Sequence, residues 1–168
     1  MLGEFLANLT FLTLKHIRSI LLVVGVLPKF GFRVFPDWYV AQRVKTLNLH
    51  VWNKPLSVIG GADLEVSASL RLINEKGNHF SFPELMWSSA TGDFPRIKMP
   101  VDEVNHHTLQ VMRQENGRVV APCGPPPQNT RAVENGTYEV IVTLSYQGWN
   151  RHYRFPSRWR LPELVEVG

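Results

Sequence analysis

Two stretches of the chain alternate apolar and polar residues. In residues 64–72, Leu-Glu-Val-Ser-Ala-Ser-Leu-Arg-Leu, every second residue from Leu64 is apolar and the residues between are polar or small. Residues 138–146, Tyr-Glu-Val-Ile-Val-Thr-Leu-Ser-Tyr, keep an apolar residue at every second position from Tyr138. Successive side chains of a β-strand point to opposite faces, so this pattern predicts antiparallel strands with one face on a core and one face in water.

Shorter stretches of the same kind lie around these two strands. Further strands are expected at residues 47–52, 79–82, 108–112, 119–120 and 151–155, separated by turn-forming sequences. Trp87 is the expected core anchor within the proline-containing stretch 83–100. Residues 121–131, which include three successive prolines, are expected to form a loop without regular structure. Together these elements predict a mainly β protein, an antiparallel immunoglobulin-like β-sandwich over residues 46–168, with a small β-barrel as the alternative.

The long late strand begins with Gly-Thr-Tyr-Glu-Val-Ile-Val at residues 136–142. This sequence resembles the closing strands of fibronectin-like and immunoglobulin-like domains. The resemblance covers residues 46–162 and concerns topology. It implies a fold and no activity, because such a sandwich hosts many unrelated functions.

The first 45 residues differ in composition from the rest. Through Asn48, six lysines and arginines stand against two acidic residues, whereas the remainder of the chain has balanced charges. Residues 5–14 and 19–27 are mostly apolar. We therefore expect an apolar, basic, helical N-terminal segment at residues 1–45, acting as a membrane anchor, followed by the β-domain at residues 46–168. A chain that starts near Val44 is then expected to fold without this segment.

The apolar run 19–27, which contains Ile20, Leu21 and Leu22, is shorter than the ~20 apolar residues that span a bilayer. Extending it back to residue 5 would bury Lys15 and Arg18, at about 3 kcal/mol each. Three interpretations stay open for this segment. It inserts into the membrane, it lies in the interface as an amphipathic helix, or it packs on the sandwich or on an apolar protein partner.

Aromatic and basic residues alternate after Pro28, a composition that suits the lipid headgroup layer. Phe30, Arg33 and Trp38 are the expected membrane-proximal residues here, and an apolar connector over one end of the core is the alternative. Basic residues beside a membrane segment favour a cytoplasmic position of the β-domain. A single cysteine, Cys123, excludes an internal disulfide and agrees with a reducing compartment. A soluble cytoplasmic protein is the alternative localisation.

Residues 149–160, Trp-Asn-Arg-His-Tyr-Arg-Phe-Pro-Ser-Arg-Trp-Arg, interleave arginines with aromatic residues. Guanidinium groups recognise phosphate and aromatic rings stack on bases, so this stretch predicts a site for a nucleotide or a single-stranded nucleic acid. Its expected ligand-binding residues are Trp149, Arg151, Arg154, Arg158, Trp159 and Arg160. The alternative interpretation is an edge strand whose tyrosine and phenylalanine enter the core while its cations discourage aggregation.

The sequence supports catalytic residues less well than it supports the binding stretch. His106 and His107 are adjacent, so on a strand they would point to opposite faces and could not easily share one metal ion. No cysteine-hydrolase signature surrounds Cys123. The sequence contains no glycine-rich phosphate loop, no paired-cysteine zinc pattern and no nucleophile elbow. No cofactor or metal is therefore expected, and an enzyme is disfavoured.

Three functions follow from the sequence. The leading one is a non-catalytic, membrane-associated module that binds a protein or a small ligand. The second is a nucleotide or nucleic-acid binder that uses the arginine-aromatic stretch, including a sensor of a cyclic nucleotide that acts through the apolar N-terminus. A hydrolase based on Cys123 or His106 is the last.

Overall fold

The computed structural model describes residues 29–39, 44–54, 63–89, 92–101, 106–123 and 130–168. The helix expected over residues 1–28, with Ile20, Leu21 and Leu22, lies outside these residues. Within the described ranges, no helix is long and apolar enough to cross a membrane. Every pair of neighbouring strands there is antiparallel, as the alternating pattern predicted.

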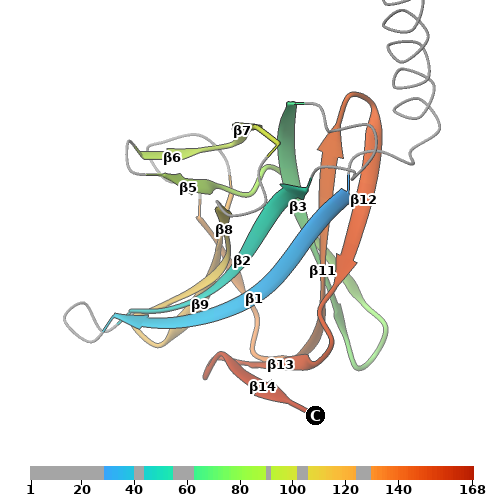
Figure 1. Cartoon of the computed structure of the whole chain (residues 1–168). Coiled ribbons are helices and arrows are strands. Elements are labelled where there is room, and N and C mark those ends of the chain that lie inside the picture. Colours follow the sequence, from blue (N-terminus) through green and yellow to red (C-terminus); the bar gives the residue numbers. More distant parts are fainter. Residues whose placement is uncertain (1–28, 40–43, 55–62, 90–91, 102–105, 124–129) are drawn as a thin grey trace, which may run out of the picture.

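Two sheets of seven strands make up the fold (Figure 1). The first sheet contains β1 (Lys29–Tyr39), β2 (Val44–Lys54), β5 (Trp87–Ser89), β6 (Gly92–Phe94), β8 (His107–Glu115), β9 (Arg118–Pro122) and β10 (Thr130–Val133). Its strand order is β1-β2-β8-β5-β6, with β9 paired to β8 and β10 paired to β9.

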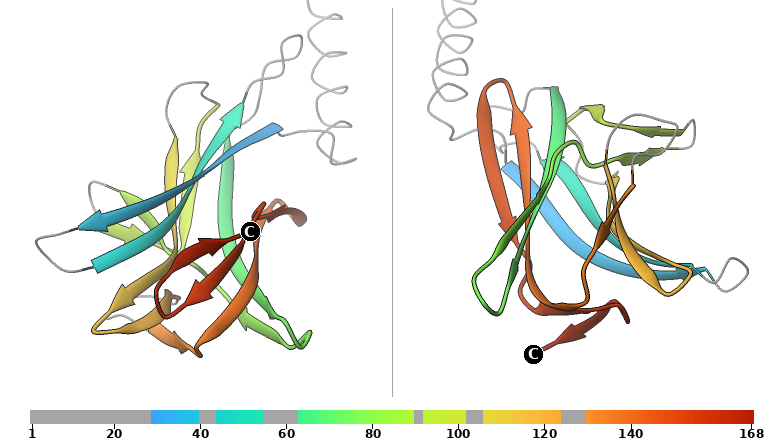
Figure 2. Two further views of the ribbon diagram at one scale, coloured as in Figure 1. Left: turned by 90° about the horizontal axis from the view of Figure 1, so that it is seen from below. Right: turned by 180° about the vertical axis from the view of Figure 1, so that it is seen from behind.

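The second sheet contains β3 (Leu64–Asn74), β4 (His79–Phe82), β7 (Arg96–Met99), β11 (Gly136–Tyr146), β12 (Trp149–Arg154), β13 (Arg158–Leu161) and β14 (Val165–Val167). Its order is β14-β13-β11-β3-β4, with β12 paired to β11 and β7 paired to β3. Neither sheet closes on itself through the described strands, so the alternative of a small barrel is wrong and the fold is consistent with a β-sandwich (Figure 2).

The core lies between the two sheets. Strands β3 and β11 pair so that Val142 lies opposite Leu70, and both side chains are buried. Leu49 and Val51 of β2 belong to the same buried cluster from the first sheet. Trp87 is fully buried, which confirms it as a core anchor. The period-two apolar pattern therefore identified the inner faces of both long strands correctly.

The loop predicted at residues 121–131 is wrong at both ends. Strand β9 continues to Pro122, and β10 starts at Thr130, opposite it. Val119 and Ala121 are both buried, so the alternation simply continues into the proline-rich stretch. Pro122 is tolerated because it is the last residue of its strand, where a missing backbone donor costs little. Residues 124–129 lie outside the described part.

The helix expected through residue 45 is wrong for residues 29–39, which form strand β1. The Phe30 ring lies edge-on to Tyr146, with centroids 5.3 Å apart, and the Phe32 ring stacks on Tyr153 at 4.6 Å. Apolar residues at every second position from Phe30, with Gly31 and Arg33 between them, are a strand pattern that the aromatic composition obscured. Since β2 starts at Val44, the expected boundary after residue 45 falls inside a strand.

Candidate functional site

Four polar side chains lie in register across the outer face of the second sheet. Arg96 of β7 pairs with Ser67 of β3, and Ser67 also pairs with Ser145 of β11. Ser145 in turn pairs with Asn150 of β12. Paired residues of neighbouring strands share a face, so these four, called the Arg96 row below, point away from the core together.

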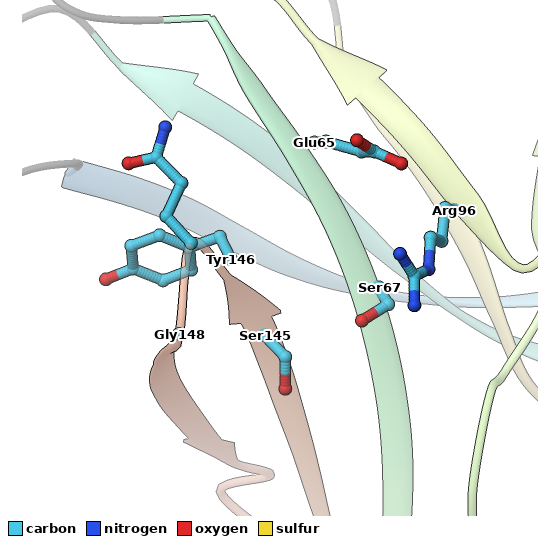
Figure 3. Close-up of a pocket in the computed structure, with 7 residues that line it drawn as sticks. Glu65, Ser67, Arg96, Ser145, Tyr146 and Gly148 are labelled. Atoms are coloured by element: carbon cyan, nitrogen blue, oxygen red, sulfur yellow. The ribbon is translucent and has the colours of Figure 1, made fainter.

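The Arg96 row borders a solvent-open hollow of about 390 Å³ (Figure 3). Its lining residues are Glu65, Ser67, Arg96, Ser145, Tyr146, Gln147 and Gly148. Gln147 and Gly148 have positive φ angles of 47° and 80°, as the tight two-residue turn between β11 and β12 requires. This turn supplies one wall of the hollow, and Figure 3 shows the Arg96 guanidinium group beside Ser67 on the opposite side.

The hollow is lined by both a cationic hydrogen-bond donor and an anionic acceptor. Arg96 is exposed and has no ion-pair partner among the described residues, while the Glu65 carboxylate is an acceptor on the same wall. The Ser145 hydroxyl donates to Asn150 Oδ1 at 2.7 Å. An amide oxygen does not take up a proton from a hydroxyl at ordinary pH, so this contact positions Ser145 without making it a nucleophile. The geometry suits binding better than catalysis.

A second hydroxyl contact lies two residues along β11 from the hollow. Thr143 Oγ1 is 2.8 Å from His152 Nδ1 on β12. A hydroxyl beside an imidazole resembles an activated nucleophile, but such a pair normally needs a third group that orients the histidine. His152 has no carboxylate partner within the described ranges, and its side chain is exposed. We therefore interpret this contact as a cross-strand hydrogen bond.

The structure disperses the predicted arginine-aromatic site. Trp159 pairs with Tyr138 and is buried in the core. Arg154 and Arg160 are exposed on the outer face. Arg154 Nε lies 2.7 Å from Glu139 Oε1, and Arg160 Nε lies 3.7 Å from Glu163 Oε2.

The backbones of these two arginines lie apart along the sheet. Arg154 lies opposite Ile141 and Arg160 opposite Thr137, four residues or about 14 Å apart along β11. Arg158 is exposed on β13 and pairs with Val167 of β14. The six predicted residues therefore form no single site.

Trp149 and Arg151 belong to another surface. They pair with Tyr146 and Leu144, whose side chains are buried, so they continue the inner face beyond the edge of the core. Trp149 is 41% exposed there, and Arg151 is exposed as well. As the alternative interpretation predicted, Phe155 is buried and Tyr153 is partly buried against it.

The predicted membrane-proximal residues that the structure describes are Phe30, Arg33 and Trp38, and all three belong to strand β1. Phe30 is half-buried against the core. Arg33 is exposed and lies opposite His50 of β2. Trp38 belongs to strand β1, where its backbone pairs with Lys45.

A histidine pair that the sequence did not predict lies on the outer face of the first sheet. The rings of His50 and His106 stack with centroids 3.9 Å apart and an interplanar angle of 17°, and Trp52 is 5.6 Å from His106. The lone pairs of parallel rings point in parallel directions and do not converge on one ion. No group of three or more metal-ligating side chains occurs among the described residues. The alternation His50, Trp52, Lys54 along β2 was the available signal.

Cys123 does not behave as an accessible nucleophile. Its side chain is buried, and its backbone bridges to Leu85 in an antiparallel pair. It belongs to the same apolar cluster as Trp87. Buried structural cysteines are chemically inert, because reaction needs an exposed thiolate. His106 lies instead in the exposed stack with His50.

The histidine stack predicts a pH effect on stability. Burial, His106 and Arg33 all lower the pKa of His50 below its ordinary value of 6.5. The unfolded chain therefore takes up a proton at His50 as the pH falls through 6.5, while the folded protein resists it. Stability contributed by neutral His50 is present above pH 6.5 and is lost as the pH falls toward the lowered folded pKa. Thermal melts across this range should show a smaller loss for His50→Asn than for the unaltered chain, and equal losses would contradict this assignment.

Comparisons with protein-family models, curated proteins and solved structures find no match to this chain. The two sheets and the site together define a β-sandwich-like fold whose outer faces carry polar and cationic side chains over a mainly apolar core.

Proposed function

We propose that this chain is a non-catalytic, membrane-associated binding module with an immunoglobulin-like β-sandwich. The single observation that supports it best is the Arg96 row with the hollow that it borders. A rigid antiparallel sheet holds these polar groups in fixed positions, which reduces the ordering cost of binding. The Ser145 hydroxyl donates to an amide oxygen and not to a base, so the arrangement supports recognition rather than chemistry.

The ligand best suited to the hollow is small and carries an anionic group. A guanidinium group recognises phosphate or carboxylate through two parallel donors, and Arg96 has no competing acid bound to it. Ser67 adds a hydroxyl beside it. Glu65 repels a second anionic group and favours a hydroxyl or amino group at the other end of the ligand. A polar, singly anionic or zwitterionic molecule fits this set.

Replacing Arg96 by alanine should weaken binding of such a ligand about 10- to 100-fold, as expected for a lost charged hydrogen bond of about 1.5–3 kcal/mol. Adenosine monophosphate and inorganic phosphate are suitable probes, with affinity measured by chemical-shift titration of the full chain. Arg118→Ala, at the start of β9 in the other sheet, removes the same charge from an exposed site and serves as the control. Equal affinities for both variants, or no binding of any anion at low salt, would contradict the proposal.

The alternative proposal places a nucleotide or a single-stranded nucleic acid on the arginine-aromatic stretch. The exposed Trp149 beside Arg151 favours it, because together they offer a ring for stacking and a cation for phosphate. The ion pairs of Arg154 and Arg160 count against it. The double variant Trp149→Ala, Arg151→Ala removes this ring and this cation, and so separates the two proposals. It should abolish nucleotide binding at the stretch and leave binding at the Arg96 row unchanged.

Membrane association rests on the sequence of residues 1–28, whose apolar runs precede β1 directly. We expect the full chain to sediment with membranes, to need detergent for extraction, and to expose the β-domain on the cytoplasmic side. Protease protection in sealed vesicles reports the side. Release of the full chain by salt or by alkaline washing would remove membrane insertion from the proposal, and a purely soluble full chain would remove membrane association altogether.

A further inference from the structure

The outer face of the first sheet carries a band of cationic and aromatic side chains. It consists of Arg33 on β1, His50, Trp52 and Lys54 on β2, and His106 before β8, and is called the β2 band below. Gly31 pairs with Trp52 and Arg33 pairs with His50, so all these positions share one face. Figure 1 shows β1 and β2 side by side along their whole length, which makes this face long and continuous.

Close packing holds the band together. A side chain on Gly31 would collide with Lys54 and would press on the Trp52 ring, so Lys54 lies across Gly31 beside the indole. Trp52 contacts His106, which stacks on His50. Arg33 and Lys54 are both exposed and have no ion-pair partner among the described residues. Arg33 and His106 both act on His50 as positive neighbours that lower its pKa.

We propose that the β2 band docks on an anionic membrane surface and lays the outer face of the first sheet against the lipid headgroups. This inference rests on the proposed membrane association and adds which face meets the bilayer. Lysine and arginine are attracted to anionic headgroups, and tryptophan partitions into the interface. The band combines these side chains on the outer face of the β1–β2 pair.

The position of the band along the chain favours a membrane over a nucleic acid as its partner. The apolar run 19–27 ends two residues before β1 begins at Lys29. Arg33 is four residues further, at most about 14 Å along an extended strand. Gly31, and Lys54 that lies across it, are nearer to the end of the apolar run than Arg33 is. Electrostatic attraction persists over about 10 Å at ordinary ionic strength, so an anchored segment would bring the band within reach of headgroup charges.

An environment-sensitive fluorophore at Thr108→Cys tests the docking. Thr108 pairs with His50 and so lies on the docking face, whereas Ser69→Cys places the same probe on the outer face of the other sheet. Both are made in the full chain with Cys123→Ala and reconstituted into vesicles of phosphatidylcholine alone or mixed with phosphatidylserine. The probe at position 108 should shift to the blue and be quenched by headgroup-labelled lipid when phosphatidylserine is present. The probe at position 69 should stay in water in both vesicles.

The double variant Arg33→Ala, Lys54→Ala should lower the docked fraction, with the docking equilibrium constant falling on the order of tenfold. Lys76→Ala with Arg71→Ala removes one lysine and one arginine from exposed positions of the second sheet and its β3–β4 turn, and should leave docking unchanged. Equal signals from the two probe positions, or no dependence on phosphatidylserine, would overturn the docking while the chain still floats with the vesicles. A full chain that fails to float with either vesicle would overturn the membrane association itself and this inference with it.

Discussion

Replacing Val142 by aspartate is expected to lower the free energy of unfolding by about 4 kcal/mol or more. Val142 has no exposed surface and lies between Leu70 of β3 and Tyr153 of β12. A carboxylate there would be desolvated without a cationic partner. Since domains are stable by only about 5–15 kcal/mol, this loss takes a large part of the total. Urea denaturation followed by circular dichroism measures it.

Thr143→Asp is the matched control, one residue along the same strand. Thr143 is half-buried on the outer face, and its hydroxyl contacts His152. An aspartate there stays partly hydrated and can accept a hydrogen bond from the histidine, so we expect a change within about 1 kcal/mol. A Val142→Asp protein that melts like the unaltered chain, together with an unfolded Thr143→Asp protein, would mean that β11 faces the other way.

The elements that local alternation specifies were predictable from the sequence. Strand β4 matches its predicted residues, and β3 and β11 extend their predicted ranges by only one or two residues. This works because a strand that buries one face must place apolar residues at every second position. Trp87 was predictable for a related reason, since a tryptophan in a proline-rich stretch has few other places to bury its surface.

The candidate site was not predictable, because it depends on pairing between distant strands. Ser67 and Ser145 are 78 residues apart in sequence and meet only through the β3–β11 register. Arg96 reaches them from β7, a four-residue strand that composition does not mark. The arginine-aromatic stretch shows the opposite case, because its residues are neighbours in sequence but do not share one face. Residues adjacent in sequence alternate between faces, so Trp159 was drawn into the core while Arg160 stayed outside.

Strand β1 shows how composition can hide a simple pattern. Phe30, Phe32 and Val34 pack against the core, as an inner strand face does. The same residues resemble an interfacial segment when they are considered by type, because aromatic and basic residues are common to both settings. The ladder of β1 with β2 is continuous from Lys29 to Tyr39 and shows no bulge. This segment is therefore part of the sandwich, in contrast to the sequence expectation.

A chain that starts at Val44 should consequently be much less stable than one that starts at Lys29. The shorter chain loses β1 and the partial burial of Phe30, Phe32 and Val34, worth about 2–5 kcal/mol at roughly half the value of full burial. It also uncovers Tyr153, on which Phe32 stacks. Strand β2 would become an exposed edge, and a long unprotected edge strand promotes aggregation. Thermal melting and analytical ultracentrifugation of the two shortened chains measure both effects.

The chain that starts at Lys29 isolates the contribution of β1 from that of residues 1–28. It keeps every described strand, so it should fold and melt cooperatively. Phe32→Ala in this shorter protein provides a graded version of the deletion, because it removes one ring stacked at 4.6 Å on Tyr153 and leaves the β1–β2 ladder intact. Its loss of stability should be smaller than that of the full deletion. If the chain from Val44 melts at the same temperature as the chain from Lys29 and stays monomeric, then β1 contributes nothing to the sandwich, and the boundary expected near residue 45 is right after all.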